Sequence, residues 1–73
     1  MRRFRDVDGR EWDVVLGRES WGALLALFVP VGGGTVMQAP LRSDGYDAAQ
    51  QELDTMEDAA LHELLRDATE KEG

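Results

Sequence analysis

The chain has 73 residues, a net charge of −7 and no cysteine. A chain of this length holds one domain and buries only about 60% of the surface that its unfolded form exposes, so a partner or oligomerisation would add to a small stability. Without cysteine the chain can form neither a disulfide framework nor a cysteine-ligated zinc site. Its longest apolar run, residues 21–31, is shorter than the roughly 20 residues that cross a bilayer as a helix. We expect a cytoplasmic domain without a targeting segment or a membrane span.

Charge is divided unevenly along this domain, which we take as 1–73. Residues 1–42 carry six arginines against five acids, a net of +1. Residues 43–73 carry ten acids against Arg66 and Lys71, a net of −8. The apolar pattern changes at the same point, from strand-like runs to helical spacing. We predict a β-sheet over 1–42 and an acidic helical hairpin over 43–73.

The first two strands are predicted around Asp8-Gly9, a strong hairpin-turn signal. A two-residue loop there would send Phe4 and Trp12 to opposite faces of the sheet. A three-residue loop that ends in a left-handed Gly9 sets Phe4 opposite Trp12, and it also sets Asp6 opposite Arg10. We prefer the second register because it places both aromatic rings on one face and pairs opposite charges.

The apolar run from Trp21 to Val31 is predicted to form the central strand, after a turn at residues 17–20 that sets Leu16 opposite Trp21. This register turns one set of side chains toward the core: Trp21, Ala23, Leu25, Leu27 and Val29. A short buried helix over 21–29, capped by Ser20, is the alternative, because Leu and Ala favour helices and a continuous apolar run has no diagnostic period. The register itself, Gly22 and the Phe28-Val29-Pro30 end favour the strand.

The remaining elements follow a glycine-rich loop at 32–34. Residues 35–41 predict a fourth strand, which Pro40 confines to an edge of the sheet because proline lacks a ladder donor. A helix capped by Ser43 or Asp44 is predicted from about 45 to 54, and a capping box at 55–58 predicts the start of a second helix. Residues 70–73 are expected to fray. The predicted fold is α+β: a four-stranded antiparallel meander followed by a two-helix hairpin packed on one face of the sheet.

No pattern in the chain indicates catalysis. The glycines at 32–34 lack the Lys-Ser/Thr that follows a phosphate-binding loop, so they are interpreted as a hairpin loop. His62 is the only histidine. It lies one helical turn after Asp58, a spacing that could hold a weak divalent ion, but a solvated helix residue is the preferred interpretation. We therefore predict no enzyme, no cofactor, no metal site and no small-molecule substrate.

Nucleic-acid binding was considered for the N-terminal hairpin. Its arginines could meet phosphates and its two aromatic rings could stack on bases: Arg2, Arg3, Arg5 and Arg10, with Phe4 and Trp12. The preferred register buries both rings, and the acidic remainder of the chain repels polyanions. We do not expect nucleic acid as a partner.

The sequence instead indicates a protein partner. If the helices cover one face of the sheet, an apolar group remains on the other, and these are the predicted partner-binding residues: Val15, Leu24, Ala26, Phe28 and Val36. Contiguous apolar patches on monomers commonly serve association, which predicts a homodimer or a subunit docked on a larger protein. Sheet twist or a helix on the far side could equally bury these residues as core. The second functional hypothesis is an acidic inhibitor or nucleic-acid mimic that acts through the helices. The alternative to it is that the acidic face of the helices is only solvated and has no partner.

Overall fold

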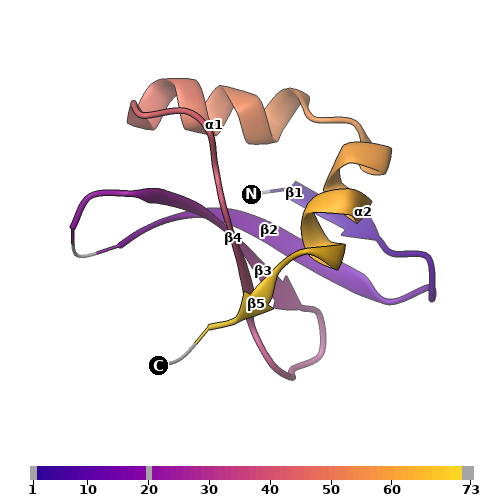
Figure 1. Ribbon diagram of the computed structural model, residues 1–73. Helices are drawn as coiled ribbons and strands as arrows, with labels where there is room; N and C mark the ends of the chain where they lie inside the picture. The colour runs from indigo at the N-terminus through magenta and orange to yellow at the C-terminus, as the bar shows by residue number, and fades with distance from the viewer. Residues whose placement is uncertain (1, 20, 72–73) are drawn as a thin grey trace.

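The computed structural model describes residues 2–19 and 21–71. Its elements follow the chain in this order: β1 (Arg2–Arg5), β2 (Glu11–Arg18), β3 (Leu24–Pro30), β4 (Met37–Pro40), α1 (Tyr46–Thr55), α2 (Asp58–Arg66) and β5 (Thr69–Glu70). The strands form one antiparallel sheet in the order β1-β2-β3-β4-β5. Helix α1 lies above the strands and α2 closes one end (Figure 1). The predicted α+β fold, an antiparallel meander followed by two helices, is confirmed.

A single cluster of buried side chains joins the sheet to both helices. Its members are Phe4, Trp12, Val14, Ala26, Phe28, Ala39, Leu53 and Leu61. Leu53 comes from α1 and Leu61 from α2, so both helices pack on the same face of the sheet. The rings of Phe4 and Phe28 meet edge to face, with centroids 5.9 Å apart. This face, here called the core face, is where the apolar area of the chain is concentrated.

The predicted register of the first hairpin is confirmed. Phe4 pairs with Trp12, and the backbone N–H of Asp6 donates to the carbonyl of Arg10 at 2.9 Å. Gly9 has a φ of 85°, a conformation that costs glycine little and other residues more. The Asp8-Gly9 turn, together with the aromatic and charged residues that flank it, therefore specified this part of the sheet.

The predicted register of β3 is wrong. Leu16 lies opposite Ala26 instead of Trp21, a shift of five positions. Because side chains alternate along a strand, an odd shift turns every residue of β3 to the other face. Trp21, expected in the core, is 78% exposed. A strand is present as predicted, but it spans Leu24–Pro30 instead of 21–31, and the helical alternative for 21–29 is excluded. The proposed cap of that helix, Ser20, lies outside the described residues.

Two glycines account for this difference. The turn between β2 and β3 closes at Trp21-Gly22, where the N–H of Gly22 donates to the carbonyl of Glu19 at 2.9 Å and Gly22 has a φ of 100°. Gly17, predicted to begin the turn, lies inside β2. A β-carbon on Gly17 would stand 2.6 Å from Leu27 Cδ1, so Gly17 leaves room for a side chain of the neighbouring strand. One glycine makes the turn, and the other serves packing.

The C-terminal part of the sheet also differs from the prediction. Met37 and Ala39 face the core opposite Phe28 and Ala26, and β5 pairs with β4, so β4 is not the edge strand that Pro40 predicted. The N–H of Lys71 donates to the carbonyl of Val36 at 2.8 Å. Fraying was therefore the wrong expectation for Glu70 and Lys71, whereas residues 72–73 lie outside the described part of the chain.

Helix α1 lies close to its predicted range of 45–54, and α2 begins at Asp58, inside the predicted capping box, but the expected side-chain caps are wrong. The N-cap residues are Gly45, which has no side chain, and Glu57, whose side chain makes no capping hydrogen bond. Ser43 Oγ donates to Glu52 Oε1 at 2.8 Å, and Thr55 Oγ1 donates to the carbonyl of Gln51. Within the described residues, no helix combines the length and the apolar character needed to cross a membrane.

Candidate functional site

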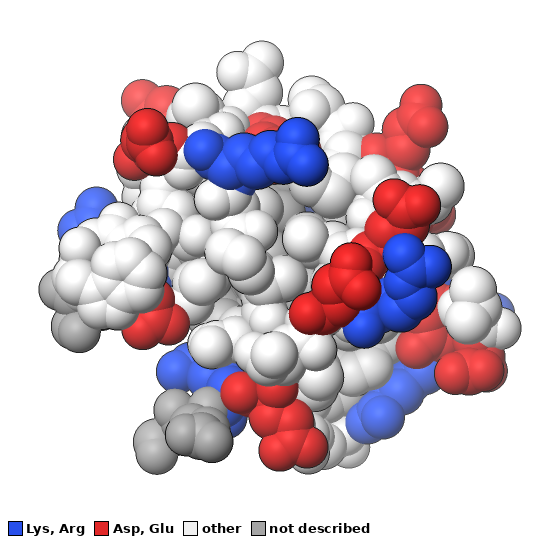
Figure 2. All heavy atoms as spheres, in the orientation of Figure 1, with Lys and Arg blue, Asp and Glu red and all other residues white. Residues whose placement is uncertain are grey.

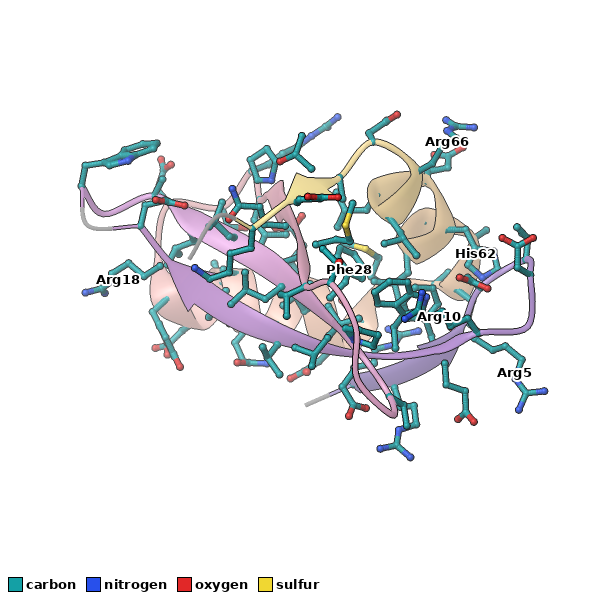
Figure 3. The ribbon with its side chains drawn as sticks, turned by 90° about the horizontal axis from the view of Figure 1, so that it is seen from below. Arg5, Arg10, Arg18, Phe28, His62 and Arg66 are labelled. Carbon is teal, nitrogen blue, oxygen red and sulfur yellow. The ribbon has the colours of Figure 1, made fainter. Side chains whose placement is uncertain are left out.

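Three of the five predicted partner-binding residues lie in the interior. Leu24, Ala26 and Phe28 are 4%, 0% and 0% exposed, because the shifted register turns them toward the helices. Figure 3 shows Phe28 at the centre of the molecule. Val15 and Val36 are half-buried. The expected orientation of β3 is corrected accordingly: these three side chains are unavailable to a partner of the folded chain.

The helix-free face of the sheet carries a different set of aliphatic side chains. We use this name for the face formed by Val15 of β2 and by Leu25, Leu27 and Val29 of β3. Val15 lies directly opposite Leu27, and Leu25 lies opposite Gly17. Val29 is 37% exposed, whereas Leu25 is 8% exposed. Strands β2 and β3 lie in front of α1 when the molecule is viewed from below (Figure 3), so α1 covers only the other face.

Two ion pairs lie along the β1 side of the helix-free face. Arg3 Nε lies 2.8 Å from Asp13 Oδ1, and Arg5 Nη2 lies 3.7 Å from Glu11 Oε1. The hydrogen bond between Arg3 and Asp13 raises the pKa of the guanidinium and lowers the pKa of the carboxyl. Each pair is neutral as a whole. The β1 side of this face therefore carries charges without a local excess of either sign.

The acidic side chains are spread over the surface. Figure 2 shows acidic residues at several separate places on one side of the molecule, with basic and uncharged residues between them. Some of them have partners within the chain: Asp58 receives Arg2 Nη2 at 2.9 Å, and Glu52 accepts from Ser43. On the side shown, the acidic residues therefore form no continuous negative stripe of the kind that a mimic of nucleic acid would present.

The four arginines of the N-terminal hairpin all contact other parts of the chain. Arg2 Nη1 donates to the carbonyl of Leu53 at 3.1 Å, at the end of α1. Arg3 and Arg5 pair with acids of β2. Arg10 Nη2 donates to the carbonyl of Gly33 at 3.3 Å, and its guanidinium lies 4.9 Å from the centre of the Trp12 ring. Each guanidinium that was considered as a phosphate ligand therefore has a contact within the chain, and those of Arg3 and Arg5 remain more than half exposed.

The turn of the first hairpin is organised by Asp6. Its Oδ1 accepts from the backbone N–H groups of Asp8 and Arg10, both at 2.9 Å. Its Oδ2 accepts from Trp12 Nε1 at 2.8 Å, and this bond is the largest of the interactions that lower the pKa of Asp6. The predicted ion pair with Arg10 is thus replaced by hydrogen bonds to the Arg10 backbone and to the indole. The carboxylate fixes the turn and one side of the Trp12 ring.

His62 of α2 joins this turn. Its Nε2 lies 2.7 Å from the carbonyl of Arg5, and since a carbonyl oxygen only accepts, Nε2 carries the proton. The His62 ring packs on Phe4, with centroids 5.5 Å apart. Figure 3 shows His62, Arg5 and Arg10 at one end of the molecule and Arg18 at the other. Instead of being a solvated helix residue, His62 fastens α2 to the hairpin.

A cleft of about 580 Å³ opens between the hairpin turn and α2. We call it the hairpin–helix cleft, and its lining is Asp6, Val7, Asp8, Trp12, Met37, His62, Glu63, Leu65 and Arg66. Sequence reasoning missed it because its residues come from separate elements, and the pairing of His62 with Arg5 has no local signal. Among the described residues, no group of three or more His, Cys, Asp or Glu side chains is arranged to hold a metal ion.

The chain was compared with protein-family models, with curated proteins and with solved structures. None of the three comparisons finds a match.

Proposed function

We propose that this protein is a small non-enzymatic interaction or regulatory module of the cytoplasm, which self-associates through the helix-free face of its sheet. One observation carries the proposal: both helices pack on the core face, while aliphatic side chains of two central strands remain on the other. Strands with apolar residues on both faces are typical of sheets that are covered on both sides. The absence of cysteine is compatible with a reducing compartment.

Charge supports a second copy as the partner. Residues 43–73 carry the net charge of −8, and the ion pairs of Arg3 and Arg5 balance the acids beside the helix-free face. Packing two helix layers against each other would bring like charges together. Packing two helix-free faces leaves the acidic helices on opposite outer sides, with sheets about 10 Å apart between them. Such a dimer supplements the core of a short chain.

Trp21 supplies a further contact for this dimer. It is 78% exposed in the turn that joins β2 to β3, the two strands whose aliphatic residues form the helix-free face. Tryptophan is enriched among residues that dominate binding energy, because it buries a large rigid surface. The sequence had assigned it to the core.

Val29→Arg tests the proposal, with Val31→Arg as the matched control. The two valines are 37% and 39% exposed, but Val31 lies in the turn after β3. Val29 is already 37% exposed beside the Arg3–Asp13 pair, so a longer charged side chain can extend into water and the monomer remains folded. By sedimentation equilibrium we expect the wild type to dimerise, Val29→Arg to weaken the dimer by at least about tenfold, and Val31→Arg to leave it unchanged.

The result that contradicts the proposal is equally direct. A wild type that sediments as a monomer from low micromolar to about 0.5 mM excludes self-association of functional strength. A dimer that both arginine variants weaken equally, or that neither weakens, places the interface elsewhere. Circular dichroism of each variant separates loss of association from loss of folding.

A further inference from the structure

The hairpin–helix cleft has the construction of a preformed binding site. Its volume of about 580 Å³ falls within the roughly 300–1,000 Å³ of small-molecule pockets. Trp12, Met37 and Leu65 contribute apolar lining, and Val7 stands at the turn with 84% of its surface exposed. An apolar side chain this exposed beside an open cleft is available to cover a bound molecule.

Hydrogen bonds hold both walls of the cleft. The Asp6 carboxylate accepts three bonds, from two backbone N–H groups and from the Trp12 indole. On the other side, His62 Nε2 donates to the carbonyl of Arg5 and ties α2 to β1. A ligand would therefore meet side chains that are already ordered, and binding would cost little reorganisation.

The charges of the lining favour one sign of ligand. Three carboxylates line the cleft, from Asp6, Asp8 and Glu63. The one guanidinium of the lining belongs to Arg66, and its Nε lies 3.8 Å from Asp67 Oδ1, which offsets its charge. The Arg10 guanidinium lies 4.9 Å from the centre of the Trp12 ring, but it does not line the cleft and donates to the carbonyl of Gly33. An apolar floor with an acidic surround is complementary to a molecule that has an apolar body and a positive group.

We propose that the hairpin–helix cleft binds a small organic cation, whose apolar body packs against Trp12 and Leu65 and whose ammonium group lies near Asp8 and Glu63. This site is on the other side of the sheet from the helix-free face, so it adds a ligand-binding role to the proposed self-association. The residues come from β2, from the hairpin turn and from α2.

Three probes with the same aromatic body and different charges test the proposal: 2-phenylethylammonium, 2-phenylethanol and 3-phenylpropanoate. The chain has two tryptophans, and their indole N–H signals serve as internal reporters in a ¹⁵N-resolved NMR titration. Trp12 lines the cleft, whereas Trp21 is 78% exposed in the turn between β2 and β3. We expect the cation to shift the Trp12 signal saturably, to leave Trp21 unchanged and to bind at least about threefold more tightly than the alcohol, with the anion weakest.

Charge-neutralising variants locate the ammonium group. Asp8→Asn keeps a residue that favours turns, and Glu63→Gln keeps a helix former. Each variant should weaken binding of the cation by about two- to fivefold and leave the affinity for the alcohol unchanged, because only the cation interacts with the lost charge. Asp44→Asn, an equal change of charge outside the cleft lining, should affect neither probe.

Three results would overturn the proposal: equal affinities for the three probes, equal shifts of both indole signals, or no saturable shift of Trp12 by about 20 mM cation. Repeating the titration with Val29→Arg separates this inference from the proposed dimer. The cleft is complete within one chain, so the cation should bind this variant as tightly as the wild type.

Discussion

Truncating neighbouring residues of β3 tests which face of the strand is buried. Phe28 is 0% exposed on the core face, and Leu27 is half-buried on the helix-free face, against Gly17. A phenylalanine side chain buries roughly 150–250 Å², which is worth about 4–6 kcal/mol at about 25 cal/mol per Å². Since alanine retains part of this area and a cavity adds to the loss, Phe28→Ala should cost about 4 kcal/mol. This value includes the loss of the edge-to-face contact between Phe28 and Phe4.

Leu27→Ala should cost much less, about 1 kcal/mol, because part of this side chain already contacts water. A domain of 73 residues has a total free energy of unfolding of roughly 4–11 kcal/mol. Phe28→Ala therefore removes a large share of it, and Phe28→Leu provides a milder variant that remains folded. The register expected from the sequence buries Leu27 and exposes Phe28, so it predicts the larger cost for Leu27→Ala and a folded monomer for Phe28→Asp. The observed structure predicts instead that Phe28→Asp unfolds the chain.

Urea denaturation followed by circular dichroism measures these differences. Protein concentration should be low micromolar, so that association contributes little to the free energy of unfolding. A change in midpoint at constant slope reports stability alone. If Leu27→Ala costs more than Phe28→Ala, the pairing of Leu16 with Ala26 is refuted, and with it the composition of the helix-free face.

Three further predictions concern single contacts. Gly17→Ala should displace Leu27, whose Cδ1 lies 2.6 Å from the added β-carbon. The expected cost in the same urea assay is about 1 kcal/mol, because Leu27 is half-buried and can shift, and a cost of zero would contradict the contact. The pKa of Asp6 is lower in the folded chain, so its contribution to stability is present above its unfolded pKa and is lost as pH falls through the folded value. Asp6→Asn should therefore flatten the acid limb of a stability-against-pH curve, and an unchanged limb would refute this. Arg2→Ala removes hydrogen bonds to the end of α1 and to Asp58, and it should lower the free energy of unfolding by about 1–2 kcal/mol. Arg2→Lys should recover only part of this stability, and full recovery would contradict a role for the planar guanidinium.

The sequence by itself determined the elements whose signals are local. Asp8-Gly9 marked the position of the first turn, and the match of Phe4 with Trp12 and of Asp6 with Arg10 selected its three-residue loop. Helical spacing after residue 43 specified two helices. Ala49, Leu53 and Leu61 are buried on them as this spacing predicts, whereas Tyr46, which the same spacing places on the apolar face, is 56% exposed. In each case the deciding interaction joins residues close together in the chain, so the pattern contains the answer.

Tertiary structure decided which side of β3 is buried. Residues 24–29 are apolar without alternation, so either face suits a core, and the choice depends on the turn before them. Both Gly17 and Gly22 suit a turn; the packing of Leu27 over Gly17 and the positive φ of Gly22 select the second. The hairpin–helix cleft depends similarly on the contact of His62 with Arg5, which are 57 positions apart. Contacts at this separation form only when the chain has folded, and they determine which apolar residues remain at the surface.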